Sequence, residues 1–190
     1  PTRRSSDLLD RSNVSVLDEN SNKDAAIVST QRDLIAGEVS KDIARRKLIP
    51  TDILEAHDSG AIHFHDMDYI IQPMFNCCLI NLEDMLTNGT VINGKKIDTP
   101  KSFQVACTVT TQIIAQVASG QYGGQSINGI DRILAPFVRK SYEKILNNVI
   151  EEQVEIYGME PNMEKAREIA WNRTRKEVKD GIQTIQYQIN

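Results

Sequence analysis

Apolar residues recur every three or four positions through most of the second half of the chain, and this spacing constrains the fold more than any other feature. Such a period places apolar side chains along one side of an α-helix. It predicts a long helix that begins near Pro100 and ends near Gly120, a second that begins near Pro136 and a third that begins near Asn162. The chain is therefore predicted to be mainly α-helical, with a few short strands.

The first of these helices is expected to have an apolar and a polar face. The apolar face is formed by Phe103, Ala106, Val109, Ile113 and Val117, and the polar face by Gln104, Thr108, Thr111 and Gln112. A glycine-rich link, 121–126, follows the helix. We interpret its Gly123-Gly124 pair as a plain turn rather than as a cradle for a phosphate group.

The first half of the chain is predicted to contain shorter elements. Thr30 is placed to cap one helix, and Thr51 starts a short helix that Gly60 ends. The segments Ile62–Ile71 and Phe75–Leu82 are short, apolar and aromatic enough to be strands. Two pairs mark turns on either side of residues 90–92: Asn88-Gly89 and Asn93-Gly94.

Length and charge limit the classes of protein to which the chain can belong. With 190 residues, 40% hydrophobic and 25% charged, it is suited to one ordinary globular domain. The net charge of −4 offers no electrostatic affinity for nucleic acid, and no apolar run approaches the roughly 20 residues that span a bilayer. We therefore expect a cytoplasmic protein that binds neither nucleic acid nor membrane. We interpret residues 1–13 as a non-native or disordered leader and residues 14–190 as one truncated domain.

The side chains best suited to chemistry concentrate in residues 60–82, which hold two of the three histidines and two of the three cysteines. The odd number of cysteines favours reduced thiols over a disulfide framework. Cys77, next to Asn76, has two interpretations that this pattern leaves open. It is either a thiol used in radical or nucleophilic chemistry, or a core residue of a non-catalytic helical interaction module.

A third interpretation depends on His63 and His65. On a strand, residues two apart face the same side, where together with Asp66 or Asp68 these histidines could ligate the metal of a metal-dependent hydrolase. His57 is the only other histidine in the chain. Because a histidine-rich site needs more ligands than this, we expect no metal to be bound here.

Several uncommon motifs occur in series along the chain. They are residues 19–24 (ENSNKD), 30–37 (TQRDLIAG), 63–69 (HFHDMDY), 74–80 (MFNCCLI), 111–119 (TQIIAQVAS), 122–124 (YGG) and 134–138 (LAPFV). In this order and at this spacing they closely resemble the anaerobic, class III ribonucleoside-triphosphate reductases. The similarity extends from about Val14 to Asn190.

The resemblance implies a fold and a reaction. The chain would be the N-terminal part of a ten-stranded α/β barrel, in an enzyme that converts ribonucleoside triphosphates to 2′-deoxyribonucleoside triphosphates. In this family a cysteine in an Asn-Cys-x-Leu segment donates hydrogen to the sugar, and that position is Cys77 here. Asn76, His65 and Asp66 are expected to bind the substrate. Cys78 is expected to point to the opposite side of the strand.

The resemblance also implies partners. Three parts of the active enzyme are expected outside these 190 residues: a glycyl radical, a thiyl cysteine and a zinc site. The radical is made by a radical S-adenosylmethionine activating enzyme with an iron–sulfur cluster. We therefore expect this chain to be inactive alone. The family forms homodimers and binds dNTP or ATP effectors, for which Lys101 and Gln112 are the expected contacts. The reductant, formate or a thioredoxin-like or glutaredoxin-like protein, stays open.

Overall fold

The computed structural model describes residues 27–121, 123–156, 158 and 160–189. The chain divides into two compact units, one made of Pro1–Cys77 with Gly120–Gly124 and the other of Cys78–Ser119 with Gln125–Asn190. The described residues are mostly helical, with a few short strands, which confirms the predicted secondary-structure class. None of the helices in the described ranges has the length and apolar character that a membrane crossing requires.

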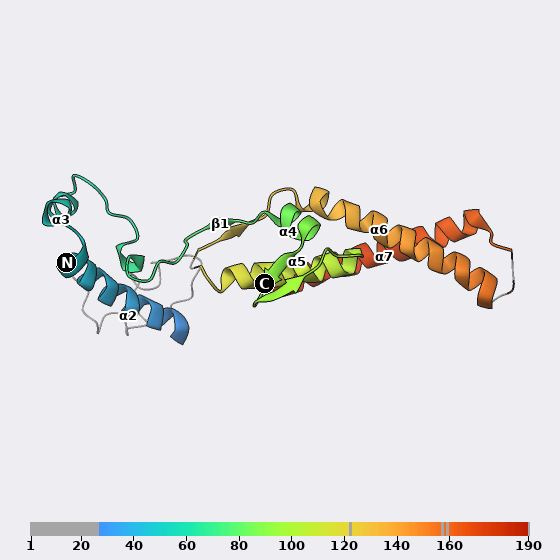
Figure 1. Ribbon diagram of the computed structural model, residues 1–190, viewed down its shortest axis with the longest axis horizontal. Helices are drawn as coiled ribbons and strands as arrows, with labels where there is room; N and C mark the ends of the chain where they lie inside the picture. Colours follow the sequence, from blue (N-terminus) through green and yellow to red (C-terminus); the bar gives the residue numbers. More distant parts are fainter. Residues whose placement is uncertain (1–26, 122, 157, 159, 190) are drawn as a thin grey trace. The chain divides into compact units, whose positions relative to one another are not determined.

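The second unit is built around three helices that run side by side (Figure 1). They are α5 (Phe103–Ala118), α6 (Ile130–Glu151) and α7 (Met163–Ile189). The predicted apolar face of α5 is confirmed: four of its five members are almost fully buried, and the fifth, Val117, packs against the same core. On the predicted polar face Thr108 and Gln112 are exposed, but Thr111 is buried and donates its hydroxyl to the carbonyl of Thr108.

The N-terminus of α5 is held by side chains from three segments. The first turn of a helix has N–H groups with no partner inside the helix. The N–H of Phe103 donates to Ser141 Oγ on α6 (2.8 Å), and the N–H of Gln104 donates to Glu177 Oε1 on α7 (3.0 Å). Ser141 in turn donates to Glu177 (2.9 Å), while the preceding Ser102 accepts from the helix as its N-cap. This network therefore joins all three helices at one point.

A glycine lets α5 and α7 approach closely. A Cβ at Gly181 would lie 2.6 Å from Phe103 Cε1 and 2.9 Å from Cys107 Sγ, both shorter than real Cβ contacts. Phe103 and Cys107 are fully buried on α5. Burial and the nearby Glu177 carboxylate raise the pKa of Cys107 from 9.0 to about 11.

The predicted start of α6 is wrong. The helix begins at Ile130, after Gly129 in a left-handed conformation, and runs through Pro136. Proline lacks an N–H and is usually placed in the first turn, which is why it suggested a start. Ile133 and Leu134, which precede Pro136, are buried in the core, and this burial favours a helix there. By contrast, α7 begins where predicted, with Asn162 accepting from the N–H of Lys165.

The strands are shorter than expected. Of the predicted strand Phe75–Leu82, only β1 (Cys78–Leu79) forms, paired in parallel with β4 (Gln125–Ser126), and Phe75 makes a single bridge with Gln121. Leu82 instead starts α4 (Leu82–Asn88), which was not predicted although Asn81 accepts from the N–H of Asp84 as its cap. Both pairings join segments that are far apart in the sequence, so the local sequence pattern did not show how many residues would pair.

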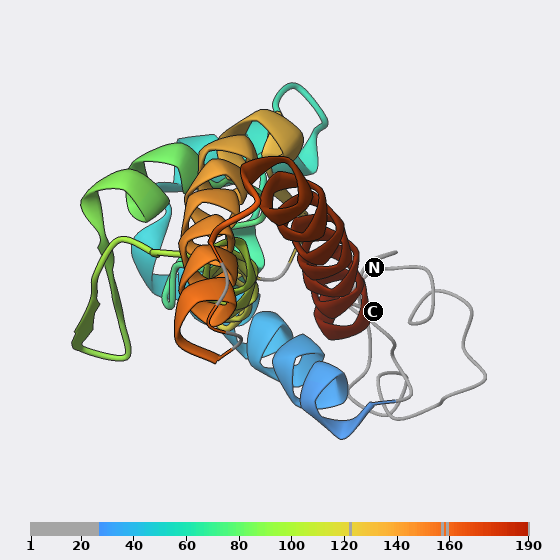
Figure 2. The ribbon, with the colours of Figure 1, turned by 90° about the vertical axis from the view of Figure 1, so that its right-hand side faces the viewer.

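A hairpin completes the second unit and lies at one side of its helices (Figure 2). Its strands are β2 (Thr90–Ile92) and β3 (Lys95–Ile97), joined by Asn93 and Gly94 with positive φ angles, so this predicted turn is confirmed. The other predicted turn, Asn88-Gly89, lies at the end of a helix and does not join two strands. Gly89, with a φ of 82°, ends α4.

The described part of the first unit is a set of short helical elements. It contains α2 (Val28–Ile43), a π-helical turn (Ala44–Leu48), α3 (Thr51–Asp58) and a 3-10 turn (Met67–Tyr69). The predicted capping role of Thr30 is wrong, because α2 begins two residues earlier and has no side-chain cap. The short helix predicted from Thr51 is confirmed, also without a side-chain cap.

The strand predicted for Ile62–Ile71 is wrong. This segment forms turns, with Asp66 in a left-handed conformation (φ 53°) just before the 3-10 turn. Two contacts hold it against α2: Tyr69 donates to Asp33 (3.0 Å), and a Cβ at Gly37 would lie 3.2 Å from Asp68 Cβ. Side-chain contacts with a helix, rather than pairing with another strand, therefore decide its conformation.

We predict that Glu177→Ala lowers the free energy of unfolding by about 2 kcal/mol, because the Gln104 N–H and the Ser141 hydroxyl both lose a charged acceptor. Urea denaturation measures this loss. Glu168→Ala, an exposed position on the same helix, is the control and should leave the midpoint nearly unchanged. Equal midpoints for the two variants would contradict the importance of this network.

Replacing Gly181 by alanine should also destabilise the chain. In an open helical position the change stabilises by up to about 1 kcal/mol, but here the added methyl overlaps Phe103 and Cys107. Overpacking of this kind costs about 1 to 3 kcal/mol. Thermal unfolding compared with Asn172→Ala, which is exposed on the same helix, tests it. A stabilised Gly181→Ala would show that α5 and α7 are not in close contact.

Candidate functional site

The thiol of Cys77 is exposed at the end of the first unit. Its Sγ donates to Oδ1 of the neighbouring Asn76 at 3.5 Å, and both side chains are accessible to solvent. Exposure alternates from Cys77 to Ile80, with Cys77 and Leu79 exposed and Cys78 and Ile80 turned into the core of the second unit. This alternation is that of an extended segment, as expected for the two cysteines.

The three cysteines therefore occupy three different environments. Cys77 is exposed, Cys78 is partly buried against the core, and Cys107 is fully buried in α5. All three are free thiols. Of the three, Cys77 is the thiol that a bound molecule could reach.

A loop that follows α5 lies directly against Asn76. Gln121 is nearly buried, and its side-chain amide donates to the carbonyls of Gly123 (2.9 Å) and Gly124 (2.8 Å). Gly123 itself contacts Asn76. Our interpretation of the glycine pair as a plain turn missed this contact. The pair of adjacent glycines was the available signal, but nothing in the sequence indicated which residue they would face.

His65 and Asp66 lie elsewhere in the first unit. Together with His57 and His63 they line a cavity of about 860 Å³, and Asn76 and Cys77 do not line it. The His65 Nδ1 lies 2.8 Å from an Asp66 carboxylate oxygen. The ring of His63 lies 5.8 Å from that of His57 and 5.6 Å from that of His65, measured between centroids. This cavity thus gathers all three histidines of the chain.

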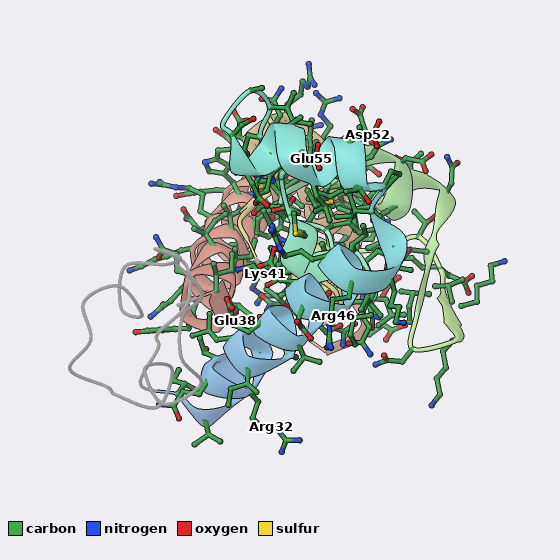
Figure 3. The ribbon with its side chains drawn as sticks, turned by 90° about the vertical axis from the view of Figure 1, so that its left-hand side faces the viewer. Arg32, Glu38, Lys41, Arg46, Asp52 and Glu55 are labelled. Carbon is green, nitrogen blue, oxygen red and sulfur yellow. The ribbon has the colours of Figure 1, made fainter. Side chains whose placement is uncertain are left out.

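The charged side chains around this cavity are arranged in pairs. On and after α2, Lys41 pairs with Glu38 (3.1 Å) and Arg46 with Asp42. Figure 3 shows Glu38, Lys41 and Arg46 following one another along this helical stretch. Arg45 pairs with Asp58 of α3 at 2.5 Å, and its hydrogen bond lowers the pKa of that carboxyl group. The cations at the cavity are therefore already neutralised by carboxylates.

The basis for a metal site built on His63, His65 and Asp66 is lost. That interpretation required a strand, which would place the two histidines on one face, and the segment forms turns instead. Within the described ranges, no three His, Cys, Asp or Glu residues come together in a group that could hold a metal ion.

The two residues expected to contact an effector lie along α5. Lys101 is exposed just before the helix, and Gln112 is exposed in its third turn. Gln112 lies nine residues after Phe103, the first residue of the helix, so about 14 Å of helix separates it from the end next to Lys101. They can contact one ligand only if it is long.

Comparison with known proteins identifies the family. Residues 19–190 match the family model described as anaerobic ribonucleoside-triphosphate reductase. The chain belongs to this family. The match covers the segments that contain Asn76, Cys77 and the glycine loop, and it confirms the resemblance seen in the sequence motifs.

Individual reductases of the family are also similar to this chain. The anaerobic ribonucleoside-triphosphate reductase of Escherichia coli K12 is 47% identical over 184 residues, which are 96% of this chain and 25% of that protein. The Haemophilus influenzae reductase is 44% identical over all 190 residues and 26% of its own length. The bacteriophage T4 reductase is 41% identical over 184 residues and 29% of its length. The chain thus spans about a quarter of the length of these reductases.

The environments of the thiols in this reductase segment predict an order of reactivity. Iodoacetamide at pH 8 should alkylate Cys77 first, Cys78 more slowly and Cys107 only on unfolding, as followed by peptide mass spectrometry. Because the pKa of Cys107 is raised in the folded chain, its contribution to stability is full below pH 9 and declines as the pH rises toward 11. Early labelling of Cys107 would contradict its burial. A urea-unfolded sample, in which all three react, is the control.

Proposed function

We propose that this protein is the N-terminal part of the catalytic chain of an anaerobic reductase that converts ribonucleoside triphosphates to 2′-deoxyribonucleoside triphosphates for DNA synthesis. The family match supports the activity, and one observation carries the site: Cys77 is an exposed, free thiol joined to the amide of Asn76. The described helices and strands would form part of a ten-stranded α/β barrel, completed by residues beyond this segment.

Cys77 is the proposed hydrogen donor. A thiol S–H bond is weak enough to release a hydrogen atom to a carbon radical, provided that the sulfur is held in contact with the sugar. The S–H bond of Cys77 breaks and a C–H bond forms at the sugar carbon, which leaves an unpaired electron on the sulfur for the reductant to remove. The 2′-hydroxyl takes up one of the two protons that the reaction consumes and leaves as water. The whole reaction consumes two electrons and two protons for each nucleotide, and formate or a dithiol protein supplies them.

Asn76 is the proposed partner of the substrate at this thiol. Its amide offers both a donor and an acceptor to the hydroxyl groups of a ribose. It is exposed next to Cys77, so a sugar in contact with the sulfur would also be within reach of the amide. His65 and Asp66 are proposed as further polar contacts of the nucleotide. Asn76 does not line the cavity that contains His65 and Asp66, so these two residues would contact a different part of the substrate.

Partners and effectors complete the proposal. Lys101 and Gln112 on α5 are proposed to contact a dNTP or ATP effector in a homodimer. A glycyl radical, formed by a radical S-adenosylmethionine activating enzyme, would supply the oxidising equivalent that starts the reaction. Residues of this segment would bind and orient the nucleotide, and we expect the segment to be inactive without the rest of the enzyme.

In the full-length enzyme that contains this segment, Cys77→Ser should abolish deoxynucleotide formation and leave the glycyl radical able to form. Serine nearly preserves shape, but its O–H bond is too strong to release a hydrogen atom to the sugar. The packing cost is about 1 kcal/mol, which leaves folding intact. Deoxynucleotide yield and the electron paramagnetic resonance signal of the radical are measured together.

The matched control is Cys78→Ser. Cys78 faces the core and not the solvent, so this variant should retain most of the activity. If Cys78→Ser is inactive and Cys77→Ser is active, the donor has been placed one residue too early. If both variants are active with normal yield, Cys77 is a structural residue only.

A further inference from the structure

Gly123 occupies a position where no side chain fits. A Cβ there would lie 2.2 Å from the main-chain oxygen of Asn76, 2.2 Å from its Oδ1 and 2.9 Å from its carbonyl carbon. Real Cβ atoms essentially never come closer than 3.0 Å to such neighbours. Two of the three atoms belong to the peptide group that joins Asn76 to Cys77. Any side chain at position 123 must therefore move that peptide group or the loop.

The requirement for glycine at position 123 is steric and not conformational. Neither Gly123 nor Gly124 has the positive φ angle that favours glycine. A Cβ at Gly124 would meet nothing within 4 Å. Neither glycine is therefore required by its backbone conformation. They differ in that only Gly123 comes close to Asn76. This difference makes Gly124 a matched control.

The loop is held in this place by Gln121. Its amide nitrogen donates to the carbonyls of both glycines, at 2.9 and 2.8 Å, and its side chain is only 9% exposed. The main chain of Gln121 forms a bridge with Phe75, the residue before Asn76. Gln121 therefore links the carbonyls of the two glycines to the residue that precedes Asn76.

We propose that Gly123 is a positioning residue for the Asn76–Cys77 pair, and this proposal rests on the proposed function of Cys77. By bringing the loop against the Asn76 peptide, Gly123 sets the direction of the Asn76 amide, which accepts from the Cys77 thiol at 3.5 Å. Hydrogen transfer depends steeply on the distance between the sulfur and the sugar. A displaced Asn76 peptide would carry the thiol away from the substrate without changing the thiol itself.

The test compares Gly123→Ala with Gly124→Ala in the full-length enzyme that contains this segment. For Gly123→Ala, deoxynucleotide formation should fall by about tenfold to a hundredfold, as expected for a displacement of about 1 Å. The rate of Cys77 alkylation in the unactivated enzyme should change and the glycyl radical signal should stay close to that of the parent, while the melting temperature falls because the loop is displaced. Gly124→Ala should match the parent in all four measurements.

Gln121→Ala provides a second route that adds no bulk. It removes the two hydrogen bonds to the glycine carbonyls and should lower turnover and change Cys77 alkylation in the same direction as Gly123→Ala. This variant decides the question if Gly123→Ala does not fold. Normal turnover in Gln121→Ala and in any folded Gly123→Ala would overturn the proposal.

The alkylation measurement separates this proposal from the proposed function. If Cys77→Ser is fully active, the donor role fails whatever Gly123 does. If Cys77→Ser is inactive but Gly123→Ala leaves both turnover and Cys77 alkylation unchanged, the donor role stands and the positioning role is overturned. The expected result is that Cys77→Ser is inactive, and that Gly123→Ala turns over more slowly and has an altered rate of Cys77 alkylation.

Discussion

The carboxylate of Glu177 at the N-terminus of α5 is the interaction on which the three-helix unit depends. A helix start presents N–H groups that need acceptors, and the partial positive charge there favours a carboxylate. The acceptors come from Ser141 on α6 and Glu177 on α7. Because they lie on different helices, α5 can begin at Phe103 only when both neighbours are in place.

The same helix face contributes a second constraint one turn later. Gly181 follows Glu177 by four residues and therefore lies on the same side of α7. The missing Cβ allows Phe103 and Cys107 to pack against the α7 backbone. The carboxylate thus sets the position of α5 along α7, and the glycine sets how close the two helices come. Burial of Cys107, with its raised pKa, is a consequence of this short distance.

The lack of a side chain at Gly123 also determines the structure of the candidate site in the first unit. Gly123 brings a loop against Asn76, and the neighbouring Cys77 keeps an exposed thiol, whereas Cys78 contacts the core. Cys77, the proposed hydrogen donor, thus has two properties that hydrogen transfer to a nucleotide would require. It is accessible, and it has a defined position.

The sequence by itself determined the long helices α5 and α7, the turn at Asn93-Gly94 and the family, because these depend on local periodicity, on backbone conformation and on motifs in series. It did not determine the start of α6, the turns of residues 62–71 or the short extent of β1. In each of these, contacts with distant residues outweighed local preference: burial of Ile133 and Leu134 extended a helix beyond a proline, and Asp33 held Tyr69 in a turn. The contact between Gly123 and Asn76 was likewise decided only by the tertiary structure, since a sequence records that a side chain is missing but not which distant atoms fill its place.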